Sequence, residues 1–78
     1  MNQDYEYRLG QRLRGLREAR KLTQEQLSAQ LQTRGCDVTR SALAKMEVGQ
    51  RHIYPDELCL LRELLQTEFD EMFPPYEI

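Results

Sequence analysis

The residues best suited to chemistry with a partner molecule lie between positions 40 and 48, where Arg40, Ser41, Ala44, Lys45 and Val48 follow at helical spacing. At 100° per residue these five side chains share one side of a helix, which we call the recognition face. Arg and Lys donate to guanine O6 and N7, Ser serves a base or a phosphate, and apolar groups meet the thymine methyl. The spacing therefore predicts contacts to base edges, although an ordinary solvated helix face has a similar composition.

A second set of polar residues flanks that segment and suits the sugar–phosphate backbone. Gln24 begins an expected helix, where its amide and the positive end of the helix dipole attract the same anion. Thr39 precedes the segment, and Gln50, Arg51 and His52 follow it. We expect all five to contact phosphate. The alternatives are a solvated helix start for Gln24 and a mobile basic loop for the residues after the segment.

These side chains need helices to position them, and the first two are signalled clearly. A leucine stripe over about residues 5–20 recurs at the i, i+4, i+7 spacing of a helix face: Leu9, Leu13 and Leu16. Thr23 and Gln26 then fit the S/T-x-x-E/Q capping box. A second helix is therefore expected over 24–33, with Gly35 ending it.

Three further helices are predicted in the rest of the chain. Thr39 is a good N-cap for a helix over 40–48, and Gly49 ends that helix. Pro55 suits the first turn of a fourth helix, whose stripe is Leu58, Leu61 and Leu65. Thr67 is expected to cap a short fifth helix before Pro74 and Pro75 forbid continuation. No segment reads as a strand of more than marginal length, so the expected fold class is all-α.

The charge is divided unevenly along the chain. The net charge is −2. Residues 1–53 hold ten Lys or Arg against six Asp or Glu, a net of +4, whereas residues 54–78 hold one Arg against seven acids, a net of −6. Because electrostatic attraction acts through faces rather than totals, the basic part suits phosphate and the acidic part must face away from it.

The length of 78 residues indicates a single domain over 1–78, with a core at 8–73 and a short tail at 74–78. Cys36 and Cys59 are too few for a disulfide framework, and neither a secretory signal nor an apolar run of about 18 residues is evident. We therefore expect a reduced, cytoplasmic protein that does not contact a membrane.

No catalytic or metal-binding constellation is evident in the sequence. Cys36, His52 and Cys59 are too scattered for a zinc site, and no serine, cysteine or carboxylate pair forms a credible catalytic set. Glu47 falls on the core side of the helix at 40–48, where a lone carboxylate is costly and needs a cation. We expect Glu47 to be structural, the protein not to be an enzyme, and no cofactor or small-molecule ligand.

The C-terminal end is rich in large apolar side chains. They are Phe69, Met72, Phe73, Tyr76 and Ile78. One reading is that they cap the core of one subunit, and the other is that they form a two-fold interface. The short length and the absence of a second domain for dimerisation favour the interface, so we expect a homodimer.

Taken in order, several short motifs resemble the Cro/repressor-type helix-turn-helix regulators of the Xre family. The matching segments cover about residues 8–73: Leu9-Gly10, Leu13-Arg14, Leu16-Arg17, Leu22 to Leu27, Val38 to Ser41, Met46-Glu47 with Gly49 and Arg51, then Glu57-Leu58 and Leu65. Each piece alone is weak, and the ordered set is specific. The resemblance implies a five-helix, lambda-repressor-like domain whose second and third helices form the helix-turn-helix.

The resemblance also implies roles for single residues. Arg17 matches the family's usual partner of the carboxylate at Glu47, which implies a partly buried ion pair. The matching glutamine, here Gln24, binds phosphate and supports the third helix. Three positions depart from the family pattern: Gln66 replaces a common glycine, Tyr54 replaces a small hydroxyl cap, and Arg62 replaces a small apolar residue. Arg62 is either a surface residue with a packed stem or part of a subunit contact.

Two function classes follow from the sequence. The first is a transcriptional regulator, with repression as the expected mode, that binds double-stranded DNA as a homodimer on a palindromic operator with half-sites about 10 bp apart. The second is a protein-binding module of the same fold, such as an antitoxin or adaptor, whose acidic residues 54–78 would be the working surface. Steep salt dependence of DNA binding separates the first from the second.

Overall fold

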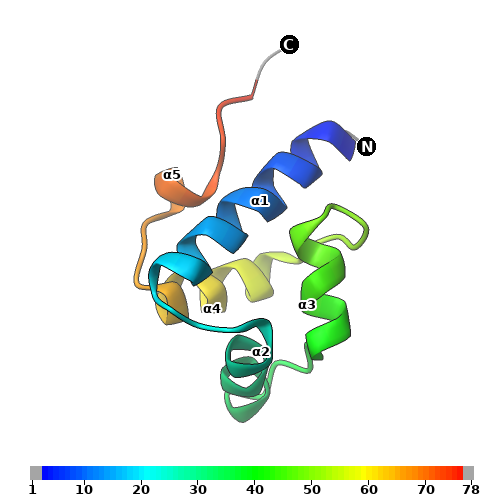
Figure 1. Ribbon diagram of the computed structural model, residues 1–78. Helices are drawn as coiled ribbons and strands as arrows, with labels where there is room; N and C mark the ends of the chain where they lie inside the picture. The colour runs from blue at the N-terminus through cyan, green and yellow to red at the C-terminus, as the bar shows by residue number, and fades with distance from the viewer. Residues whose placement is uncertain (1–2, 77–78) are drawn as a thin grey trace.

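The predicted helices are all present in the computed structural model, which describes residues 3–76 (Figure 1). Their bounds are α1 Gln3–Ala19, α2 Gln24–Thr33, α3 Arg40–Glu47, α4 Pro55–Leu65 and α5 Phe69–Met72. No strand occurs within these residues. The all-α, five-helix prediction is confirmed.

Side-chain caps set where α2 and α3 begin. Thr23 Oγ1 accepts from the backbone N–H of Gln26 at 3.0 Å, and Gln26 Oε1 accepts from the N–H of Thr23 at 2.8 Å. Thr39 Oγ1 accepts from the N–H of Ala42 at 3.1 Å. Each cap satisfies a first-turn donor and is worth about 1 kcal/mol. The register of both helices therefore follows from local sequence.

The apolar stripes of α1 to α4 meet in one core together with the short α5. Its buried members are Leu13, Leu27, Leu31, Val38, Leu43, Met46, Leu61, Leu65 and Met72. Met72 has no exposed surface. Its assignment to a dimer interface is therefore wrong, because its side chain completes the core of a single subunit.

Helix α1 approaches the end of α3 closely because it carries a glycine there. A Cβ built on Gly10 would lie 2.3 Å from the carbonyl oxygen of Met46 and 2.6 Å from that of Glu47. The next residue, Gln11, donates from Nε2 to the Glu47 carbonyl at 2.9 Å. Gly49, at φ 74°, also lies close to α1, since a Cβ built on it would lie 2.8 Å from Tyr7 Cα.

The segment after α4 returns to lie along α1 (Figure 1). Gln66 ends α4 in the left-handed region at φ 53°, where the family pattern has a glycine. Thr67 does not cap α5: the helix begins at Phe69 with Glu68 as N-cap. The Thr67 hydroxyl is instead buried, with no hydrogen-bond partner among the described residues. That prediction is wrong because the Thr67 side chain is buried, at 5% exposed, and is not turned toward the start of α5.

Side chains of α1 fix the path of the last described residues. Tyr5 Oη donates to the carbonyl of Pro74 at 2.8 Å, Arg8 Nη2 to that of Pro75 at 2.8 Å, and Arg12 Nη1 to that of Glu71 at 2.9 Å. The C-terminal segment is thus held by α1 through its backbone carbonyl groups.

Candidate nucleic-acid interface

The inward face of α3 is anchored by a buried ion pair. Arg17 Nε donates to Glu47 Oε2 at 2.7 Å, and Arg17 Nη2 donates to Glu47 Oε1 at 3.1 Å. The two residues are 7% and 2% exposed. Hydrogen bonding to Glu47 raises the pKa of Arg17, so the guanidinium keeps its charge. The pair that the family resemblance implied is present, and it ties α3 to α1.

Gln24, the first residue of α2, is tied to the same carboxylate. Its Nε2 donates to Glu47 Oε1 at 3.0 Å. An amide nitrogen carries two donors, so one N–H remains for a second partner. Gln24 is half-buried at the first turn of α2, where backbone N–H groups point out of the helix. The start of α2 therefore keeps a fixed position relative to α3.

The recognition face lies on the opposite side of α3. Arg40, Ser41 and Lys45 are exposed, Ala44 is half-buried, and Val48 just after the helix is 41% exposed. Neither Arg40 nor Lys45 forms an ion pair with another residue in the range 3–76. Both cations are therefore available to a partner without the cost of breaking an internal contact.

Arg51, in the turn after α3, has an internal partner that the sequence analysis missed. Its Nη1 and Nη2 donate to Glu57 Oε1 and Oε2 at 3.0 and 2.9 Å, and its Nη1 also donates to the carbonyl of His52 at 2.9 Å. These contacts use three of the five guanidinium donors. The phosphate contact predicted for Arg51 must therefore compete with a two-pronged ion pair.

Glu57 is buried in the first turn of α4. Its Oε1 also accepts from the backbone N–H of Tyr54 at 2.9 Å. Hydrogen bonding from Arg51 lowers the pKa of this carboxyl group, and the Tyr54 N–H adds to the effect. The signal for this role was present in the sequence, because Glu57 stands four residues before Leu61 on the apolar stripe and three residues after the helix cap.

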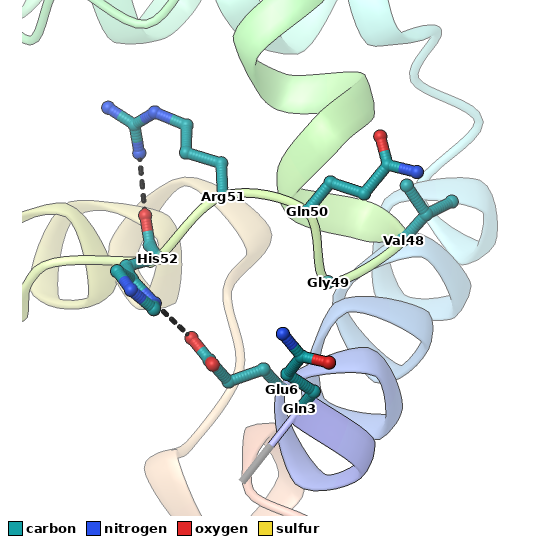
Figure 2. A pocket seen from close by; sticks show the side chains of 7 residues that line it. All are labelled: Gln3, Glu6, Val48, Gly49, Gln50, Arg51 and His52. Atoms are coloured by element: carbon teal, nitrogen blue, oxygen red, sulfur yellow. Dashed lines mark hydrogen bonds and ion pairs between the residues drawn. The ribbon is translucent and has the colours of Figure 1, made fainter. Parts of the chain in front are cut away.

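Between this turn and the start of α1 lies an open hollow of about 610 Å³ (Figure 2). It is lined by Gln3, Glu6, Val48, Gly49, Gln50, Arg51 and His52. His52 turns toward α1, and its Nδ1 contacts Glu6 Oε1. Gln50 instead projects beside Val48 (Figure 2). Of the three polar turn residues, Gln50 is thus the one directed toward the recognition face.

The remaining C-terminal aromatic residues are on the surface. Phe69, Phe73 and Tyr76 are 40%, 37% and 62% exposed, and Ile78 lies outside the described residues. The Arg62 guanidinium carbon lies 5.3 Å from the centre of the Phe69 ring. Arg62 therefore packs on a surface aromatic residue of its own subunit.

Other kinds of site find little support in the part of the chain that the structure covers. No group of three or more His, Cys, Asp or Glu side chains in residues 3–76 is arranged to hold a metal ion. None of the described helices combines the length and apolar character needed to cross a membrane.

Comparisons with known proteins bear on the whole domain. A family model described as a helix-turn-helix domain matches residues 8–72. A solved structure, the crystal structure of the DNA-binding domain of BldD, superposes with a TM-score of 0.80 at 23% sequence identity. The match covers 95% of this chain and 100% of that chain. At that identity the likeness shows a shared fold. A search of curated proteins finds no match.

Proposed function

The chain belongs to the helix-turn-helix domain family, and from this premise we propose that it regulates transcription by binding double-stranded DNA at specific sequences. Helix α3 enters the major groove with the recognition face toward the base edges. One observation carries the proposal: Arg40, at the start of α3, and Lys45, on the side of α3 away from Glu47, are exposed and form no ion pair among the described residues, while the buried Arg17–Glu47 pair fixes the helix. A rigid helix presenting free cations suits guanine recognition.

Contacts to phosphate set the orientation of this helix on the duplex. The second N–H of the Gln24 amide donates to a phosphate oxygen while the first stays on Glu47. The Thr39 hydroxyl accepts from Ala42 and keeps its own proton for another phosphate. Gln24 and Thr39 begin α2 and α3, so both contacts lie at positive ends of helix dipoles.

The solved structure similar to this chain is titled the DNA-binding domain of BldD. The shared fold supports the proposed orientation for this chain. The uneven charge agrees with it, since the net +4 of residues 1–53 includes α2, α3 and the turn after α3.

The finer proposal is a homodimer that represses transcription from a palindromic operator. Phe69, Phe73 and Tyr76 present aromatic surface in the C-terminal segment, and together they form the proposed contact between subunits. Half-sites about 10 bp apart place both α3 helices on one face of the DNA.

Selection of bound sequences from random duplexes tests class and symmetry together. Enrichment of a two-fold motif supports a dimeric operator, and a single asymmetric motif supports a monomeric reader. Binding to the selected duplex should weaken with salt at a slope near −0.9 per neutralised phosphate. No enrichment, with no binding at low salt, would refute the proposal and favour a protein-binding module.

A further inference from the structure

Three contacts hold the turn after α3 in place, and they leave the Gln50 side chain exposed. The Gly49 backbone abuts Tyr7 of α1, His52 contacts Glu6 of α1, and Arg51 is paired with Glu57 of α4. Gln50, between these tied residues, is exposed and projects beside Val48 (Figure 2). The turn is thus built so that Arg51 and His52 each have a partner within the protein, while the Gln50 amide is exposed.

We infer that Arg51 and Glu57 form a positioning pair for DNA binding, in which Gln50 rather than Arg51 contacts the phosphate. The inference rests on the proposed function. Arg51 donates three hydrogen bonds to Glu57 and the His52 carbonyl, and its side chain is 28% exposed. The Glu57 side chain is 10% exposed, so breaking the pair would leave a buried carboxylate without its cation, which is costly.

The geometry explains how the pair acts on Gln50. Glu57 Oε1 accepts from both Arg51 and the backbone N–H of Tyr54, which joins the turn to the first residues of α4. The Arg51 bond to the His52 carbonyl closes the turn on itself. With both ends of residues 50–54 held, the Gln50 backbone has little freedom, so a phosphate contact of its amide has to order only the side chain.

The direction in which Glu57→Gln changes DNA affinity distinguishes a positioning role from a purely electrostatic one. Glu57→Gln removes a negative charge from the DNA-binding side, so electrostatics alone would strengthen binding. Positioning requires weaker binding, by roughly threefold to tenfold, which corresponds to one neutral hydrogen bond. Glu63→Gln is the matched control, because it removes the same charge from the exposed ion pair that Glu63 of α4 forms with Arg34 at the end of α2. The control should bind at least as tightly as the unmodified protein.

Arg51→Lys provides a second test that keeps the charge. Lysine binds phosphate well as a point charge but cannot form a two-pronged bond to a carboxylate. If Arg51 only positions the turn, Arg51→Lys should weaken binding about as much as Glu57→Gln, with an unchanged salt slope. Gln50→Ala should produce the same loss by itself, and adding it to Glu57→Gln should cause little further loss.

The assay is fluorescence anisotropy with the selected duplex at several salt concentrations, on variants shown by circular dichroism and thermal unfolding to be folded at the assay temperature. Tighter binding by Glu57→Gln, with a salt slope steeper by about 0.9, would show that Arg51 is a phosphate contact held back by Glu57 and overturn the inference. Full affinity in Arg51→Lys, or a lower melting temperature with unchanged affinity, would overturn it too. If the unmodified protein binds no duplex, the proposed function itself fails.

Discussion

Gly10→Ala should destabilise the protein even though alanine is the better helix former. In the helix interior the exchange by itself gains about 1 kcal/mol. At this position, however, the new Cβ would lie 2.3 Å from the Met46 carbonyl oxygen. Ordinary contact begins at 3.4 Å, so α1 must move away from α3 by about 1 Å. The Met46 carbonyl belongs to the backbone and the new Cβ is attached directly to it, so neither group can rotate aside.

The displacement also reaches the contacts that depend on this approach. Gln11 donates to the Glu47 carbonyl at 2.9 Å, and Arg17 holds the Glu47 carboxylate at 2.7 Å. Overpacking a close contact costs about 1–3 kcal/mol, and straining a buried ion pair adds to that cost. After the gain in helix propensity, we expect a net loss of about 1–2 kcal/mol, which lowers the melting temperature of a domain this size by roughly 5–15 °C.

The same helix offers the matched control. Gly15 is exposed and has nothing within 4 Å of a built Cβ, so Gly15→Ala should stabilise by about 0.5–1 kcal/mol. The measurement is urea unfolding of both variants followed by circular dichroism at 222 nm, with stability compared at constant m-value. Equal stability of the two variants would mean that α1 does not approach α3 as closely as described.

Four other outcomes are expected. Arg17→Met should cost about 3–5 kcal/mol in urea unfolding because it strands a buried carboxylate; a loss below about 1 kcal/mol would contradict the burial. Thr67→Val should be neutral or stabilising by up to about 1 kcal/mol, since the buried hydroxyl has no partner among the described residues, and clear destabilisation would reveal a bound water. Pairing with Arg51 lowers the pKa of Glu57. The contribution of this pair to stability is complete above the ordinary glutamate pKa of about 4.3 and is lost as pH falls through the depressed value. The stability of Glu57→Gln should therefore fall less steeply below about pH 4.3 than that of the unmodified protein. Arg40→Ala should cost about 1–3 kcal/mol of DNA affinity and relax selection at one base position, and an unchanged selected motif would remove Arg40 from the recognition face.

Local signals in the sequence predicted the helices well, because the information lies within a few residues. Thr23 and Thr39 cap the helices they were expected to cap, and Gly49 adopts the expected positive φ. The failure at Thr67 has a different origin. A threonine between two helices reads as a cap, but the burial of its side chain depends on how the segment after α4 packs on the rest of the domain, which no local pattern contains.

The site was predicted unevenly for the same reason. The recognition face follows from periodicity within α3, so its exposed residues were found. Arg51 looked like any basic turn residue, although the buried register of Glu57 six residues later carried a signal for its partner. Met72 fitted either the core of one subunit or a subunit contact, and only the path of the C-terminal segment along α1 decides between the two. Pairings that depend on how separate helices meet need three-dimensional information, except where a family pattern supplies it, as for Arg17 and Glu47.

The way the C-terminal segment is held has a consequence for sequence variation. Tyr5, Arg8 and Arg12 donate to carbonyl groups of residues 71, 74 and 75, and a carbonyl is present whatever side chain the residue carries. The path of this segment therefore depends on these residues of α1 as well as on its own buried Met72. Its exposed residues can therefore be substituted in variants of this protein, and a new contact with another molecule can arise there without disturbing the fold.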